Sequence, residues 1–156
     1  MTIATAFATL QDLIDRHPEQ LTILAADETT GLRDDIRVVR AIEDAGAEMT
    51  GILLARYSAA DLDRLDATSE AILRVYCMDI ALYRISLSFA RTSDALKERY
   101  EASIARLKDI AKGAGGLVVL GTGGAAPGSE AGDGAATPNG VMISAPERMF
   151  TRERMW

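Results

Sequence analysis

The sequence predicts an all-α protein: an antiparallel bundle of three long helices, with short N-terminal helices before it and a Gly-rich loop and extended C-terminal arm after it. Three observations lead to this fold class. Apolar residues recur at spacings of three and four over residues 34–55, 69–90 and 93–112, which places them on one face of an α-helix. Ten of the 13 glycines fall between Gly113 and Gly140, so few helix breakers precede them. The connections between the three segments are short, which favours antiparallel neighbours.

A cap and a proline mark the two short helices. Thr9 is a suitable N-cap for a first helix that ends at Arg16. It stops there because the residue before Pro18 is disfavoured in the α region. Proline itself fits the first helical position, so a second short helix is expected over Glu19–Ala25. Asp27–Gly31 then forms a loop.

The first long helix is capped by Asp34 or Asp35 and runs to about Ala55. Gly46 and Gly51 lie inside it and each costs about 1 kcal/mol relative to alanine, so we expect close packing at both positions. The residues expected on its inner stripe are Ile36, Val39, Ile42, Met49 and Leu53.

The second long helix, Ser69–Ala90, is expected at the centre of the protein. It follows a surface loop at Arg56–Asp66, which has a helical turn over Ala60–Leu65, and Thr68 or Ser69 is its N-cap. Its apolar stripe consists of Ile72, Val75, Met78, Leu82, Ile85 and Phe89. The stripe is widened by Ala71, Cys77 and Ala81, whereas a wetter flank is marked by Arg74, Asp79 and Arg84. Because the apolar surface is wide, neighbouring helices can contact more than one side of this helix.

The third long helix begins after a tight corner at Arg91–Asp94, with Ser93 as its N-cap. Gly113 follows Lys112 and is a typical helix stop. Its stripe consists of Leu96, Tyr100, Ile104 with Ser103 beside it, Leu107 and Ile110. The helical bundle domain is therefore expected to span residues 1–112.

The character of the chain changes after this helix. Residues 113–140 are too rich in glycine to bury much apolar surface, which is typical of a flexible linker or a hairpin loop. Two short β-like runs, Leu117–Leu120 and Val141–Ser144, lie near its ends. They are expected either to pair with each other as a hairpin or to add to the sheet edge of a partner.

Residues 141–156 are predicted to form a C-terminal docking arm. Large apolar side chains and arginines alternate there, and such residues anchor protein–protein interfaces. Disordered tails are usually poor in Met, Phe and Trp, which favours docking on another chain over a disordered end or a segment folded back on its own bundle. The candidate partner-binding residues are Met149, Phe150, Arg152, Arg154, Met155 and Trp156, with another protein chain as the partner.

Composition argues against several classes of protein. The net charge of −6 is unsuited to a dedicated nucleic-acid binder, because phosphate binding relies on clustered Lys and Arg. No apolar run reaches the roughly 20 residues that span a bilayer, and nothing resembles a signal peptide, so the sequence predicts a cytoplasmic protein without a membrane partner.

No catalytic, metal or cofactor site is predicted. Leu120–Ala126 mimics a dinucleotide-binding loop after a strand, but Pro127 follows where a helix N-terminus is required. His17 and Cys77 have no companions at ligand spacing, and the thiol lies in an apolar helical pattern, which is typical of a buried, inert cysteine. Asp61–Asp66 lacks the glycine turn and terminal Glu of a calcium loop, which favours a solvated acidic loop.

Five segments resemble the head–tail connector, or adaptor, proteins of Mu-like phages and prophages, homologues of the product of Mu gene thirty-six. They are residues 7–14 (FATLQDLI), 45–57 (AGAEMTGILLARY), 77–84 (CMDIALYR), 99–113 with its RY and ARLKDIAKG phrases, and 148–153 (RMFTRE). The segments are mostly helical, and their order and spacing carry the likeness. The sequence departs from the family at Ser58–Ala60, where a proline-containing loop is expected, and in the length of the glycine linker.

The resemblance implies a structural protein and no enzyme. Members of the family form a ring beneath the portal, extend the DNA channel and join the head to the tail. The implied partners are the portal protein, neighbouring copies in a ring that is expected to be a dodecamer, and a tail-side connector or terminator protein. DNA passes through the channel without specific binding. The implied location is the neck of the virion, with the host cytoplasm as the site of assembly. The alternative function is a small soluble helical regulatory or peptide-binding module.

Overall fold

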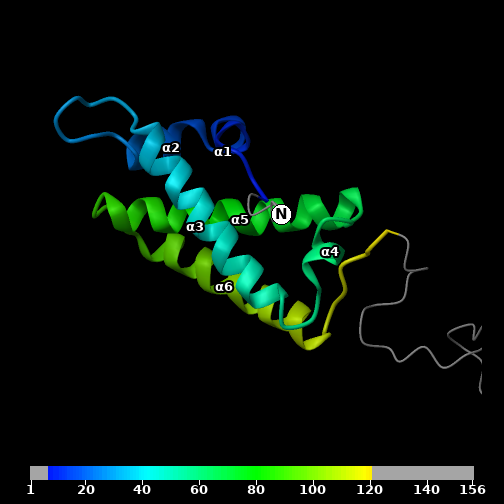
Figure 1. The fold of residues 1–156 in the computed structure, drawn as a ribbon. Helices are drawn as coiled ribbons and strands as arrows, with labels where there is room; N and C mark the ends of the chain where they lie inside the picture. Colours follow the sequence, from blue (N-terminus) through cyan, green and yellow to red (C-terminus); the bar gives the residue numbers. More distant parts are fainter. Residues whose placement is uncertain (1–6, 121–156) are drawn as a thin grey trace, which may run out of the picture.

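A computed structural model describes residues 7–120 of the chain (Figure 1), and these residues are mainly helical, as predicted. The helices are α1 Leu10–Arg16, α2 Pro18–Leu24, α3 Asp35–Leu53, α4 Ala59–Leu62, α5 Ala67–Ser88 and α6 Asp94–Lys112. Within residues 7–120, β structure is limited to two isolated bridges, one between Ala26 and Arg33 and one between Leu65 and Val119. The all-α prediction is therefore confirmed for the part of the chain that the structure describes.

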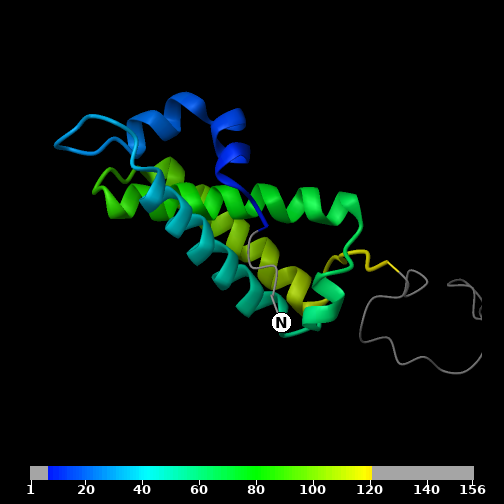
Figure 2. The ribbon, with the colours of Figure 1, turned by 45° about the horizontal axis from the view of Figure 1, so that its top comes forward.

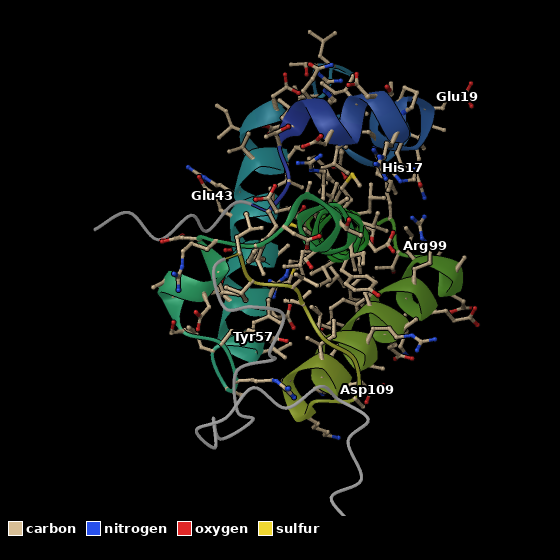
Figure 3. The ribbon with its side chains drawn as sticks, turned by 90° about the vertical axis from the view of Figure 1, so that its right-hand side faces the viewer. His17, Glu19, Glu43, Tyr57, Arg99 and Asp109 are labelled. Carbon is tan, nitrogen blue, oxygen red and sulfur yellow. The ribbon has the colours of Figure 1, made fainter. Side chains whose placement is uncertain are left out.

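The three long helices pack on one another, with α5 in contact with both α3 and α6. In Figures 1 and 2, α3 and α6 run in the same general direction and α5 runs in the opposite one. The short helices α1 and α2 lie on the side of α5 away from α6 (Figure 3). Helix α5 therefore has neighbours on several sides, and its buried residues lie on more than one side. They are Ser69, Leu73, Cys77, Met78, Ile80, Ala81, Leu82, Ile85 and Ser86.

Most helix ends lie where the sequence predicts them. Thr9 and Asp12 form a capping box at α1, and Pro18 is the first residue of α2. The side chain of Ser93 accepts a hydrogen bond from the Leu96 N–H at the start of α6, and Gly113 ends that helix with a left-handed φ of 93°. Asp34 caps α3 through the Arg37 N–H, and the helical turn expected over Ala60–Leu65 is present as α4.

The cap of the central helix differs from the prediction. Asp66, and not Thr68 or Ser69, caps α5, and its carboxylate accepts a hydrogen bond from the Ser69 N–H at 2.9 Å. Ser69 has another use, because its hydroxyl accepts a hydrogen bond from the Val118 N–H at 2.9 Å and is buried. Because the Ser69 hydroxyl is used in this contact, the carboxylate of Asp66 caps the free N–H groups at the start of the helix.

Four residues expected on the inner stripes are exposed instead. Ile36 and Val39 are 68% and 39% exposed on α3, and Ile72 and Val75 are 42% and 37% exposed on α5. The buried stripe of α3 begins with Val38, Ala41, Ile42 and Ala45, and that of α5 begins with Ser69, Leu73 and Cys77. Small side chains on these stripes let the helices approach closely, whereas the prediction followed the largest apolar residues. The predicted stripe of α6 is correct, since its members are buried or packed on the core.

The two glycines inside α3 differ in their surroundings. Gly46 is buried, as close packing requires. Gly51 is exposed, and a Cβ added there would have no atom within 4 Å, so the expectation of close packing at Gly51 is wrong.

The loop before α5 and the segment after α6 are joined by hydrogen bonds and pack on the core. Tyr57 and Leu65 are buried, so the predicted surface loop over Arg56–Asp66 contributes to the core. The Tyr57 hydroxyl accepts a hydrogen bond from the Leu117 N–H at 3.0 Å, and Leu65 bridges to Val119. Leu117 and Val119 are buried as well, so the described core extends beyond Lys112. The hairpin expected between Leu117–Leu120 and Val141–Ser144 is untested, because residues 141–144 lie outside the described residues.

Candidate functional site

The predicted docking residues lie outside residues 7–120 that the structure describes. They are Met149, Phe150, Arg152, Arg154, Met155 and Trp156. The Leu120–Ala126 phrase lies outside them as well, except for its first residue. The candidate functional features of the described residues are therefore the polar groups between the long helices and the exposed surfaces of α3, α5 and α6.

Three features of residues 7–120 concern metal binding, membrane insertion and thiol reactivity. Among residues 7–120, no three His, Cys, Asp or Glu side chains come together as a metal-binding group. The same residues include no helix long and apolar enough to cross a membrane. Cys77 is buried, as predicted, and burial raises the pKa of its thiol to about 11, which keeps it protonated and unreactive at neutral pH.

His17 occupies the junction of α1 and α2 and is half-buried there. Figure 3 shows it on the same side of the molecule as Arg99 of α6. Burial lowers the pKa of the imidazole, the positive charge of Arg99 lowers it further, and Asp79 partly opposes both effects. The folded protein therefore favours the neutral imidazole of His17 more than water does.

Glu48 of α3 connects the three long helices. Its carboxylate accepts a hydrogen bond from Arg84 Nη2 of α5 at 2.6 Å and one from the Tyr100 hydroxyl of α6 at 2.9 Å. Tyr100 also stacks on Tyr83 of α5, with 4.6 Å between the ring centroids. Because one carboxylate is bound to groups from two other helices, this cluster fixes the relative positions of α3, α5 and α6.

A second polar cluster joins α5 to α6. Arg99 Nη2 donates to the carboxylate of Asp79, and the Ser103 hydroxyl donates to the same carboxylate at 3.4 Å. Asp79 and Arg84 were expected on a wetter flank of the central helix, and both are partly exposed ion-pair partners at its interfaces. The sequence did not predict these pairs, because the partners are 20 and 36 residues apart along the chain.

We expect the stability of the protein to fall at alkaline pH because of Tyr100. Burial raises the pKa of its phenol, and the hydrogen bond to Glu48 and the negative charge of that carboxylate raise it further. The folded state therefore prefers the protonated phenol. This contribution is fully present below the unfolded pKa of about 10 and is lost as the pH rises through the folded pKa. Denaturant titrations from about pH 8 to about pH 11 should show a steeper decline for the native sequence than for Tyr100→Phe. Equal slopes would contradict the prediction.

The outer surface of α3 carries a shallow apolar hollow. It has a volume of about 370 Å³ and is lined by Asp35, Ile36, Val39, Arg40 and Glu43. Two exposed branched apolar side chains thus lie among charged residues, and Asp35 is paired with Arg33 at 2.5 Å. An arrangement of this kind suits a protein partner that supplies apolar contact at the centre and charged groups at the edge.

A second hollow lies on the other side of Arg40, between α3 and α5. Its volume is about 430 Å³, and its lining residues are Arg37, Arg40, Ala41, Asp44, Arg84, Leu87 and Ser88. Arg37 is held by Asp34 at 3.2 Å and by the ring of Phe89, whose centroid is 4.8 Å from the guanidinium carbon. The charges of this hollow are largely balanced, because Asp44 also lines it and Arg84 is paired with Glu48 at 2.6 Å.

Exposed apolar residues also occur on the N-terminal half of α5. Ile72 and Val75 precede Asp79 by seven and four residues, so the three lie along one side of the helix. The sequence placed Ile72 and Val75 in the core. The sequence feature that could have corrected this placement is a second, equally apolar stripe through Leu73, Cys77 and Ile80.

The comparisons with known proteins agree with the resemblance found in the sequence. A family model described as "Bacteriophage Mu, Gp36" matches residues 7–136, a range that includes the six helices that the structure describes. No curated protein matches the chain.

Proposed function

The chain belongs to the bacteriophage Mu Gp36 family, and we propose that it is a structural head–tail connector. In this proposal, twelve copies form a ring beneath the portal, extend the DNA channel and receive a tail-side connector or terminator protein. The protein is assembled in the host cytoplasm and resides in the neck of the virion. The observation that carries the proposal is the family match, together with the order of the family's phrases along the sequence.

The helical core has properties that suit such a component. Ion pairs and hydrogen bonds of Glu48 and Asp79 connect its long helices, so the subunit can keep one shape in a ring. The net negative charge repels DNA phosphates, which allows DNA to pass through a channel without being held. Exposed apolar side chains on α3 and α5 provide surfaces for contact with other subunits.

The arm at residues 141–156 is the proposed portal-binding segment. The 29 residues from Leu120 to Met149 can span at most roughly 100 Å when fully extended, which is enough to reach a neighbouring protein in an assembly. Met149, Phe150, Met155 and Trp156 supply apolar anchors, and three arginines supply charged hydrogen bonds.

We expect truncation after Ala145 to abolish capture by the cognate portal ring. The six helices found within residues 7–120 all precede Gly113, so the truncated protein should retain the circular dichroism signal of these helices. Its affinity for the portal should fall by at least about 30-fold, the equivalent of one interface residue worth about 2 kcal/mol. Light scattering of portal complexes formed with full-length and truncated protein measures the bound copies.

The result separates three cases. Full-strength capture of the truncated protein would refute the role of the arm and leave the connector function intact. If the portal captures many copies of the full-length protein and none of the truncated protein, both the role of the arm and the connector function are supported. If neither form is captured and both are monomers, the chain is better described as the alternative, a small helical peptide-binding module.

A further inference from the structure

We propose that the subunits contact each other through two different faces of the helical core. The first is the α3 face: Asp35, Ile36, Val39, Arg40 and Glu43. The second is the α5–α6 flank: Ile72, Val75, Asp79, Arg99 and Arg106. The α3 face of one copy packs on the α5–α6 flank of the next copy. This inference rests on the proposed ring and adds to it the surfaces that build the ring.

The α3 face is apolar at its centre and charged at its edge, where Asp35 is paired with Arg33 and Arg40 and Glu43 complete the row. Ile36 is more than half exposed although it lies at the start of a well-packed helix, and Val39 lies one turn further along the same side. Glu43, the next residue of this row, forms no ion pair with another residue of the range 7–120. It is therefore available to a cation from outside the subunit.

The α5–α6 flank is apolar with a basic edge. Asp79 is bonded to Arg99, and α5 and α6 run in opposite directions. Residues before Asp79, such as Ile72, and residues after Arg99 therefore lie towards the same end of the molecule, where α5 and α6 diverge (Figure 1). Arg106 is seven residues after Arg99, which is close to two turns, so both lie along nearly the same side of α6. Arg106 is exposed and, within residues 7–120, has no ion-pair partner.

The two faces complement each other. The two exposed apolar residues of the α3 face can pack on the two of the α5–α6 flank. The negative charge of Glu43 on the first face can pair with the positive charge of Arg106 on the second. Arg99 is already paired with Asp79, so Arg106 is the flank residue that offers a free positive charge among residues 7–120. A second copy of the chain therefore supplies what each face lacks.

The positions of the two faces favour a head-to-tail arrangement. In Figure 3, Glu43 lies on one side of the molecule and Arg99 on the opposite side, with α5 between them. A two-fold dimer uses one patch on both partners, whereas two different patches on opposite sides build a ring or an open filament. The geometry is thus the one that a ring of identical subunits needs.

The experiment blocks one face at a time in the full chain. Ile36→Asp places a charge in the α3 face and Ile72→Asp places one in the α5–α6 flank. Each variant alone should be monomeric by light scattering, with self-association at least about tenfold weaker than that of the native sequence. An equimolar mixture should form a dimer, because each variant retains the face that the other lacks. Leu54→Asp, at a residue that is 48% exposed outside both faces, is the matched control and should assemble normally.

A charge exchange tests the pairing itself. Glu43→Arg and Arg106→Glu should each weaken assembly, and the double variant should restore the native mass. Circular dichroism of every variant verifies the fold. Restoration in the double variant supports a direct contact, since two unrelated surface defects would add.

Other outcomes overturn the inference in distinguishable ways. If Ile72→Asp still dimerises and only Ile36→Asp does not, the α3 face pairs with itself. If truncation after Ala145 abolishes self-association and Arg106→Glu does not, the arm covers the α3 face. If the portal captures many copies of every variant equally, the faces are wrong and the connector function stands. A native protein that is monomeric both alone and with the portal would refute the connector function and this inference together.

Discussion

Leu82→Ala is expected to lower the free energy of unfolding by about 2–5 kcal/mol. Leu82 is fully buried in α5, the helix that α3, α6 and the short N-terminal helices surround. Removing most of its side chain loses apolar contact and leaves a cavity that a helix packed on several sides cannot close. Since small domains have total stabilities of about 5–15 kcal/mol, this one change removes a large part of the total. Urea denaturation followed by circular dichroism measures the difference.

Leu87→Ala is the matched control for this prediction. It is the same substitution on the same helix, but the side chain is 53% exposed. Its effect should stay within about 0.5 kcal/mol, as for most surface positions. If the two variants lost equal stability, α5 would not be the central helix of the core.

The boundaries of the helices could be predicted because their causes are local. Thr9, Pro18, Ser93 and Gly113 act on the backbone within one turn of their own positions. The cap of α5 could not be predicted in the same way. The hydroxyl of Ser69 is bound by the Val118 N–H, a residue 49 positions later, and this contact exists only in the folded chain.

The sides that α3 and α5 turn towards the core were less predictable. A helix with apolar residues on several sides allows more than one stripe, and the choice depends on how closely its neighbours approach. On α3, Ala41, Ala45 and Gly46 permit a close approach, so the core follows them, and Ile36 is left exposed. The misassigned residues Ile36, Val39, Ile72 and Val75 are the ones that form the apolar centres of the two proposed contact faces.

The polar clusters between helices could not be predicted from spacing at all. Glu48 and Tyr100 are 52 residues apart, and nothing in either helix alone distinguishes this carboxylate from other glutamates of the chain. The clusters depend on the positions at which α3, α5 and α6 pass one another. For the same reason they are sensitive tests of the described packing.

Glu48→Ala is expected to destabilise the protein by about 2 kcal/mol. The change leaves the Arg84 guanidinium and the Tyr100 hydroxyl without the carboxylate that accepts from both, and hydrogen bonds to a charged group are worth about 1.5–3 kcal/mol each. The expected destabilisation is smaller than the sum of these two hydrogen bonds. The side chains of Arg84 and Glu48 are about one-third and one-quarter exposed, so water replaces part of the lost interaction.

The comparison with Glu48→Gln separates charge from hydrogen bonding. The amide retains an oxygen that can accept from the Tyr100 hydroxyl but loses the negative charge that Arg84 faces, so its cost should be about half that of alanine. A double-mutant cycle of Glu48→Ala with Arg84→Ala should give a coupling energy of about 1 kcal/mol in urea denaturation. Arg64→Ala, which removes a pair with Asp61 on α4, should show no coupling to Glu48→Ala. A coupling near zero between Glu48 and Arg84 would mean that the two groups do not interact across α3 and α5, and the described arrangement of these helices would then be wrong.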